Sequence, residues 1–208
     1  MMYQKPHIPK GCIHIGGEWN TGFVIENSVD KSQYTWIPLG VIPGILESFQ
    51  NCEEEFEEMD MYLIKNSIIK YGGIYFSTYP MSYDCNSKSV SIEKEKYTTL
   101  VSFKKAKFEA VNMSKTFEKV CNTHLPYEWE YENIIKCVLL LTEDKNFDNG
   151  KFALYDLNKL WIWTMKKHGP WAAVVKKYEA DGPNEEVYAN IDFVGYKEIG
   201  FRTVLVCI

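Results

Sequence analysis

Apolar and polar residues alternate in short runs over the first part of the chain, and glycines separate these runs. Two of the runs, 11–16 and 21–26, stand on either side of the Gly-Glu-Trp-Asn segment 17–20. Alternation on both sides of a short glycine-containing link predicts a β-hairpin, because successive side chains of a strand point to opposite faces. Residues 33–39 form a third extended run. The pattern therefore predicts three consecutive strands.

The spacing of apolar residues then changes to that of a helix. Residues 44–51 follow Pro43 and have apolar positions on one helical face, and proline is favoured where helices begin. Residues 61–71 have apolar positions three and four apart and stop at Gly72-Gly73. This segment predicts a second helix that ends on glycine, with a strand as the alternative.

The rest of the chain is mostly strand-like. A short capped helix is expected at 114–121 and a buried strand at 134–142. The Asp-Asn-Gly sequence at 148–150 predicts a hairpin turn, because Asn and Gly tolerate left-handed backbone. Residues 157–164 fit a helix or a strand, and alternate tryptophans there favour the strand. The remaining predicted strands are 74–79, 89–92, 97–103, 107–112, 151–155, 171–179, 186–194 and 201–207.

Many short strands with few helices and no internal repeat predict an α+β, β-rich fold, namely an antiparallel β-sandwich with a few short helices packed on it. The chain has 208 residues, of which 46% are hydrophobic, and this suits one domain over 1–208. The polar segment 80–88 is the candidate position for an internal loop break. No apolar run approaches the roughly 20 residues of a membrane span, and the first residues lack the apolar core of a signal peptide. We therefore expect no membrane association and a cytosolic location.

The charged residues of the chain indicate which kinds of partner it could bind. The formal net charge is -5, and Arg202 is the single arginine among 23 basic residues. Arginine is the residue that contacts phosphates and base edges with two donors at once, so direct nucleic-acid readout is not expected. An acidic run could form a surface patch for a cation or a basic partner, although such runs are more often solvated loops or helix starts. Its members are Glu53, Glu54, Glu55, Glu57, Glu58 and Asp60.

The six cysteines are widely and irregularly spaced, without a CxxC motif. Buried free thiols are therefore expected for most of them, with Cys137 and Cys207 as the clearest cases. Two Cys/His pairs are weak candidates for a zinc site, against the commoner structural roles of these residues. The pairs are Cys12 with His14 and Cys121 with His124.

No sequence motif of a known enzyme class is present, and we expect a protein that is not an enzyme and has no cofactor. The remaining catalytic hypothesis is a thiol nucleophile, Cys12 or Cys121, with His168 as its base. Trp161, Trp163 and Trp171 fit an aromatic ligand platform or, more commonly, a core and an interface.

The order of elements resembles that of a cypovirus polyhedrin. The resemblance begins with Lys-Gly-Cys-Ile-His-Ile at 10–15, Gly-Phe-Val-Ile-Glu-Asn at 22–27 and Gln33-Tyr34. A short helix, an acidic stretch and Lys-Asn-Ser-Ile at 65–68 ahead of the glycine pair follow in the same order. Pro-Tyr-Glu-Trp-Glu at 126–130 and Phe-Ala-Leu-Tyr at 152–155 resemble a later strand pair of that family.

The resemblance implies a structural protein that crystallises in the host-cell cytoplasm as an occlusion body, protects virus particles and dissolves in alkali. The implied partners are further copies of the chain and virions, and a trapped nucleotide is implied by the family alone. We expect the helical arm that ties polyhedrin molecules together to be shortened or missing, because few residues precede the first predicted strand. The second hypothesis is a small acidic cytosolic binding protein, such as a toxin-neutralising immunity protein.

Composition suggests how alkali would act. Fourteen tyrosines and six cysteines gain negative charge at high pH, so like charges would accumulate above about pH 10. The alternative is that these tyrosines are ordinary core residues. The candidates for such an alkaline switch flank predicted turns and are Tyr3, Tyr34, Tyr71, Tyr79, Tyr83, Tyr127 and Tyr178.

Overall fold

The computed structural model describes residues 6–20, 22–52, 56–83, 89–93, 97–117, 121–142, 152–155, 157, 160–178, 185–193 and 196–207. Its α-helices are α1 (Ile45–Gln50), α2 (Glu58–Tyr71), α3 (Phe103–Met113) and α4 (Glu128–Thr142). Two short 3-10 helices are η1 (Leu39–Val41) and η3 (Ser114–Thr116). Within this part of the chain, no helix is long and apolar enough to cross a lipid bilayer.

The larger sheet has six strands in the order β1-β2-β3-β4-β12-β7, and every neighbouring pair is antiparallel. The C-terminal strand β12 is inserted between β4 and β7, so the end of the chain completes a sheet begun near its start. The strands are β1 (Cys12–Gly16), β2 (Val24–Asn27), β3 (Gln33–Ile37), β4 (Ile74–Ser77), β12 (Val204–Cys207) and β7 (Cys121–His124).

The smaller sheet has the order β10-β9-β8-β11, in which only the short β11 runs parallel to its neighbour. A separate two-stranded pair is formed by β5 and β6. The strands of the smaller sheet are β8 (Trp161–His168), β9 (Ala172–Lys177), β10 (Glu185–Asn190) and β11 (Ile199–Gly200), and those of the pair are β5 (Ser82–Tyr83) and β6 (Ser89–Val90).

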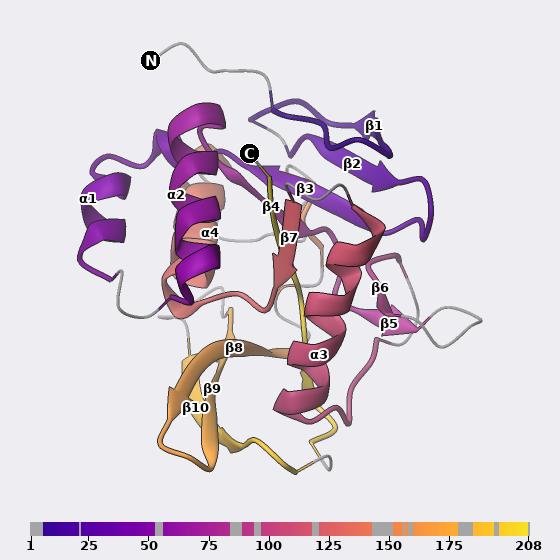
Figure 1. Cartoon of the computed structure of the whole chain (residues 1–208), viewed down its shortest axis with the longest axis vertical. Helices are drawn as coiled ribbons and strands as arrows, with labels where there is room; N and C mark the ends of the chain where they lie inside the picture. The colour runs from indigo at the N-terminus through magenta and orange to yellow at the C-terminus, as the bar shows by residue number, and fades with distance from the viewer. Residues whose placement is uncertain are drawn as a thin grey trace.

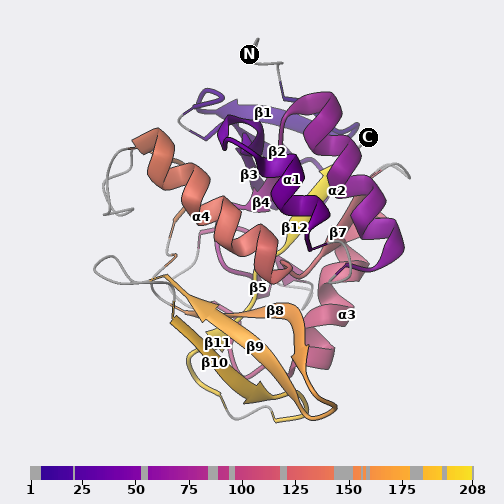
Figure 2. The ribbon, with the colours of Figure 1, turned by 90° about the vertical axis from the view of Figure 1, so that its left-hand side faces the viewer.

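Both faces of the six-stranded sheet are buried at β12. Along β12, Val204 and Val206 pack with residues of α1, α2 and α4, whereas Leu205 packs with residues of α3 and of the four-stranded sheet. Figures 1 and 2 show α1, α2 and α4 gathered on one side of the larger sheet and the smaller sheet at the far end of the molecule from β1. A strand that is buried on both faces usually has a continuous run of apolar residues. β12 fits this rule, because its sequence is Val-Leu-Val-Cys.

Arg202, the single arginine, lies in the centre of this arrangement and is 0% exposed. Its Nη1 donates to the carbonyl oxygens of Ser77 at 2.8 Å and Thr78 at 3.3 Å, and its Nη2 donates to the carbonyl oxygen of Tyr155. The guanidinium also lies over the ring of Phe76, 5.5 Å from its centroid. The side chain therefore ties the end of β4 to the 152–155 segment and is not on a surface that could meet a phosphate.

The predicted fold class is confirmed. The protein is α+β, with two mostly antiparallel sheets and short helices packed against them. The first hairpin, the third strand, both early helices and the strand after Gly73 are found where the pattern placed them. The single domain over 1–208 stays a prediction. Within the loop break expected at 80–88, Ser82–Tyr83 form strand β5, which pairs with β6 just after the segment. Residues 84–88 lie outside the described residues.

Two predicted strands, 97–103 and 107–112, are wrong. Loose alternation predicts strands there, but 97–102 has no regular secondary structure and α3 occupies Phe103–Met113. Its buried positions recur three and four residues apart, and the Ser102 hydroxyl accepts a hydrogen bond from the Lys105 amide at 3.2 Å as an N-cap. The helical period and the cap outweigh the local alternation. Of the helix expected at 114–121, Ser114–Thr116 form η3, residues 118–120 lie outside the described residues, and β7 begins at Cys121.

The predicted strand 134–142 is also wrong, because it is the second half of α4. An uninterrupted apolar run fits a buried strand or a buried helix equally well, and only the start of the element distinguishes them. The start is given by Glu130, whose Oε2 accepts a hydrogen bond from the Tyr127 amide at 2.9 Å, as in half of a capping box. The 126–130 segment therefore begins a helix, not the strand that the polyhedrin resemblance implied, and 152–155 carries no strand.

The expectation of free thiols is wrong for one pair. Cys121 on β7 and Cys207 on β12 are register partners and form a disulfide, with their Cα atoms 4.1 Å apart. Cys137 is a buried free thiol, as expected, and burial raises its pKa to about 12. The disulfide joins two strands that lie 86 residues apart in sequence, so cysteine spacing along the chain gave no sign of it.

Candidate functional site

An apolar groove lined by large side chains lies on the described surface. It lies between η1, α1 and the C-terminal end of α2, with the β1–β2 link at its far end. Its volume is about 810 Å³, within the range of about 300–1,000 Å³ typical of ligand pockets. The lining residues are Trp19, Trp36, Pro38, Gly40, Val41, Ile42, Pro43, Gly44, Ile45, Leu46, Glu47, Ile68, Ile69, Tyr71 and Gly72.

Glycines and prolines shape the floor of the groove. The Gly40 amide donates to the Gly72 carbonyl oxygen at 2.8 Å, and a Cβ on Gly40 would meet that oxygen at 3.1 Å. Gly44 precedes α1 with a φ of 71°, and Gly72 follows α2 with a φ of 85°, both in the left-handed region that favours glycine. The close approach of the two segments brings the start of α1 beside the end of α2.

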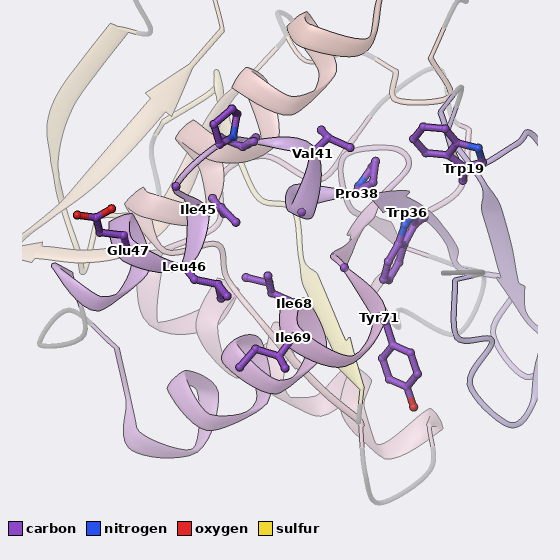
Figure 3. A pocket seen from close by; sticks show the side chains of 15 residues that line it. Trp19, Trp36, Pro38, Val41, Ile45, Leu46, Glu47, Ile68, Ile69 and Tyr71 are labelled. Carbon is purple, nitrogen blue, oxygen red and sulfur yellow. The ribbon is translucent and has the colours of Figure 1, made fainter. Parts of the chain in front are cut away.

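The two walls of the groove differ in chemistry. Figure 3 shows the aromatic rings of Trp19, Trp36 and Tyr71 along one side and aliphatic side chains of α1 and α2 across from them. Trp36 is nearly buried, at 2% exposed, whereas Leu46 and Ile69 on the opposite wall are 39% and 59% exposed. We call the exposed edge formed by Leu46 and Ile69 the lip of the groove. These two side chains remain exposed to solvent, although burying a large aliphatic side chain stabilises a protein or a complex by about 1.5–3 kcal/mol.

The groove has the chemistry of a binding surface. Of the described residues that line it, Glu47 is the only charged one, and none is a cysteine, serine, histidine or lysine. Acyl transfer and acid–base catalysis need a nucleophile or a proton carrier within reach of the substrate. The lining can hold an apolar group and one cation, and its groups able to carry a proton are the Glu47 carboxylate and the Tyr71 hydroxyl.

A second cluster, the His124 network, has the residue types of a catalytic site but is enclosed. His124 Nε2 lies 3.1 and 3.0 Å from the two carboxylate oxygens of Glu130. On its other side, His124 Nδ1 lies 3.7 Å from Asp60 Oδ1. Asp60 also accepts hydrogen bonds from the Tyr127 hydroxyl at 2.9 Å and the Asn122 amide at 2.6 Å.

The charges and the burial of the His124 network indicate a structural role. Burial lowers the pKa of His124, but the charge and hydrogen bond of Glu130 and the charge of Asp60 outweigh it and raise the pKa overall. His124, Glu130 and Asp60 are only 2%, 0% and 5% exposed. The network connects α2, β7 and the start of α4. Its groups are buried, so a substrate in solution would not reach them.

A third cluster joins the smaller sheet to α4. Lys176 on β9 lies 2.7 Å from Glu128, 3.0 Å from Glu132 and 2.8 Å from Glu186, and Lys166 also pairs with Glu128. Burial lowers the pKa of Lys176, but hydrogen bonds to the three glutamates raise it overall. Burial raises the pKa of Glu128, but the lysines lower it to about 2. The cluster therefore stays charged across the neutral range and fixes α4 on the sheet.

The zinc candidates do not meet. Cys12 and His14 are on β1 and Cys121 and His124 are on β7, which are the two opposite edges of the six-stranded sheet. Cys121 is in the disulfide and His124 is in the buried network. Within the described ranges, no group of three or more His, Cys, Asp or Glu side chains is arranged to hold a metal ion.

The described residues of the proposed thiol nucleophile and of the proposed tryptophan platform do not come together in one site. Cys121 is oxidised to the disulfide, Cys12 is half-buried on β1, and the side chain of His168 lies outside the described residues. Trp163 is fully buried against Phe103, at a ring distance of 5.9 Å, whereas Trp171 is 70% exposed. The tryptophans thus divide between core and surface and form no platform.

The acidic run does not act as one patch. Asp60 is buried in the His124 network, and Glu57 pairs with Lys107 at 2.6 Å. Glu58 is exposed in the first turn of α2, where a carboxylate favours the helix dipole. The remaining members, Glu53, Glu54 and Glu55, lie outside the described residues.

Most tyrosines proposed for an alkaline switch are not at the surface. Tyr34, Tyr127 and Tyr178 are 0%, 2% and 5% exposed, and Tyr71 and Tyr79 are half-buried. Burial is the largest cause that raises the pKa of Tyr34 and of Tyr127. Tyr3 and the side chain of Tyr83 lie outside the described residues. The described candidates therefore fit ordinary core tyrosines better than an exposed alkaline switch.

The comparisons with known proteins identify no relative. No protein-family model matches the chain, and neither a curated protein nor a solved structure matches it significantly. The resemblance to cypovirus polyhedrins consequently stays a prediction.

Proposed function

We propose that this chain is a structural protein that associates with copies of itself through the apolar groove. The observation that carries the proposal is the uncovered lip of the groove, where Leu46 and Ile69 are 39% and 59% exposed beside an aromatic wall. Exposed apolar patches with a polar rim are typical of protein contact sites. The enclosure of the His124 network supports a role that depends on contacts more than on catalysis.

The polyhedrin resemblance extends this proposal to a matrix that crystallises in the host cytoplasm, encloses virus particles and dissolves in alkali. These finer points rest on the order of elements alone. The Cys121–Cys207 disulfide weighs against the cytoplasmic location, because such bonds persist mainly in oxidising compartments.

The proposal is tested by measuring molar mass with light scattering from about 1 μM to about 1 mM, the range of moderate to weak association. We expect the mass of the wild-type protein to rise with concentration and that of Leu46→Glu to stay at the monomer. Tyr188→Glu is the matched control, because Tyr188 is 56% exposed on β10 in the other sheet. A wild-type monomer throughout contradicts the proposal and favours the small acidic binding protein, whose partner would then occupy the groove.

A further inference from the structure

A second exposed apolar surface follows the outer face of α3. We call it the α3 ridge and define it by Lys104, Phe108 and Val111 of α3, together with Leu100 just before the helix and Lys115 in η3 just after it. Leu100, Phe108 and Val111 are 52%, 61% and 45% exposed. Residues three and four apart lie on one face of a helix, so the ridge is continuous.

Lysines flank the apolar centre of the ridge. The Lys104 side chain is 68% exposed and pairs with Asp192, and that of Lys105 is 50% exposed and pairs with Glu109. The carboxylate partners are less exposed, at 49% and 13%. Lys105 Nζ also lies 5.6 Å from the centroid of the Phe108 ring. The lysine side chains beside Phe108 are therefore more exposed than their carboxylate partners.

The groove and the ridge are complementary. Both present apolar side chains at their centres, and the charged group of the described groove lining, Glu47, has the opposite sign to the lysines of the ridge. Two grooves facing each other would instead bring together two Glu47 carboxylates without a basic partner from the lining. Opposite charges across an interface steer association and set its register.

We propose that the groove of one molecule receives the α3 ridge of a second copy, which rests on the proposed self-association and names its partner surface. Figures 1 and 2 place α3 on a different side of the molecule from α1. The contact is thus heterologous, and each pair keeps one groove and one ridge unoccupied. Heterologous contacts that do not close into a ring grow without limit, as an assembling matrix requires.

Two complementary variants test this arrangement by sedimentation velocity. Ile69→Lys places a cation on the groove lip and leaves the ridge intact, whereas Phe108→Glu places an anion on the ridge and leaves the groove intact. Both positions are more than half exposed, at 59% and 61%, so the monomer fold should tolerate them. We expect each variant alone to self-associate at least about tenfold more weakly than the wild-type protein.

The equimolar mixture is the decisive sample. The ridge of Ile69→Lys fits the groove of Phe108→Glu, so the mixture should associate more strongly than either variant alone. A mixture that stays monomeric while the wild-type protein assembles overturns the α3 ridge as partner but leaves self-association standing. Undiminished assembly of Phe108→Glu alone overturns it as well. A wild-type protein that never associates overturns both proposals.

Discussion

His124 and Glu130 face each other inside the protein, with the imidazole Nε2 3.0 and 3.1 Å from the two carboxylate oxygens and both side chains almost fully buried. Glu130 thereby joins β7 to α4, because the same carboxylate accepts the Tyr127 amide at the helix start. Asp60 on the other side of the ring adds α2 to the joint. Since α2 also forms one wall of the groove, the charge on His124 helps to hold the proposed contact surface in place.

We predict that His124→Gln destabilises the protein most at low pH. The raised pKa of His124 means that its stabilisation is complete below the unfolded pKa of about 6.5 and is lost as pH rises through the higher folded value. Removing one partner of a buried charge pair costs about 3 kcal/mol, and glutamine keeps a hydrogen-bonding group without the charge. Urea unfolding at a series of pH values measures the difference. His14→Gln, at an exposed position, is the control, and an equal loss at every pH contradicts the charged imidazole.

Lys176→Met should show the opposite dependence on pH. The substitution leaves Glu128, Glu132 and Glu186 without their shared cation, and the free energy of unfolding should fall by about 3 kcal/mol near neutral pH. The lowered pKa of Glu128, about 2, means that its contribution is present above the unfolded pKa of about 4.3 and is lost as pH falls toward 2. The difference between wild-type and variant should therefore shrink below about pH 4.

A comparison variant makes that prediction specific. Lys177→Met removes the neighbouring lysine, which is half-buried and lies 5.9 Å from the centroid of the Trp161 ring. Its loss should cost less than that of Lys176, because the three carboxylates keep their cation. Equal destabilisation by both substitutions would show that the cluster around Lys176 is not a joint of the fold.

Buried tyrosines should make the fold itself unstable in alkali. Burial is the largest cause that raises the pKa of Tyr34, Tyr75, Tyr127 and Tyr131, so these phenols stay neutral in the folded protein. In the unfolded chain they ionise near pH 10, and the free energy of unfolding falls above that pH by about 1.4 kcal/mol per pH unit for each tyrosine. Alkali would then release an assembly by unfolding its molecules.

Circular dichroism and tyrosinate absorbance measured on one pH titration check this mechanism. We expect part of the phenol signal to appear together with the loss of structure, and Tyr131→Phe to lower the pH dependence by about 1.4 kcal/mol per unit. Ionisation of all tyrosines near pH 10 with the structure intact would instead favour exposed phenols as the switch.

Reduction of the Cys121–Cys207 disulfide should lower the free energy of unfolding by about 3 kcal/mol, since a crosslink between strands distant in sequence restricts the unfolded chain. Mass spectrometry after alkylation of the denatured, unreduced protein should leave these two cysteines unlabelled. Cys12→Ser is the control, because Cys12 is a half-buried thiol outside the disulfide and its loss leaves the crosslink intact. Labelling of both Cys121 and Cys207 without reductant contradicts the bond.

Elements with a local signal were predictable from the sequence. The first hairpin follows from alternation around a short glycine-containing link, and α1 and α2 follow from helical spacing that begins after Pro43 and ends before Gly72. The two missed helices carried weaker evidence of the same kind. Ser102 and Glu130 are capping residues whose role depends on where the helix begins. The second half of α4 has Lys136 as its one charged residue, so little polar contrast reveals its helical period.

The candidate site could not be predicted, because it depends on which segments the fold brings together. Trp19 and Tyr71 come from the β1–β2 link and the end of α2, and only the larger sheet places them beside η1. The prolines and glycines between 38 and 44 marked an unusual connection but gave no sign that it lines a groove. The disulfide was missed for the same reason, since β12 joins β7 only in the folded sheet.

Hydrogen exchange at low and high protein concentration tests the groove as the contact between molecules most directly. We predict that amide exchange slows on association in peptides covering 38–47 and 66–72, together with those of α3, while β10 is unchanged. Protection confined to β10 or to another surface, or mass that rises with concentration without any protection at the groove, would contradict the account.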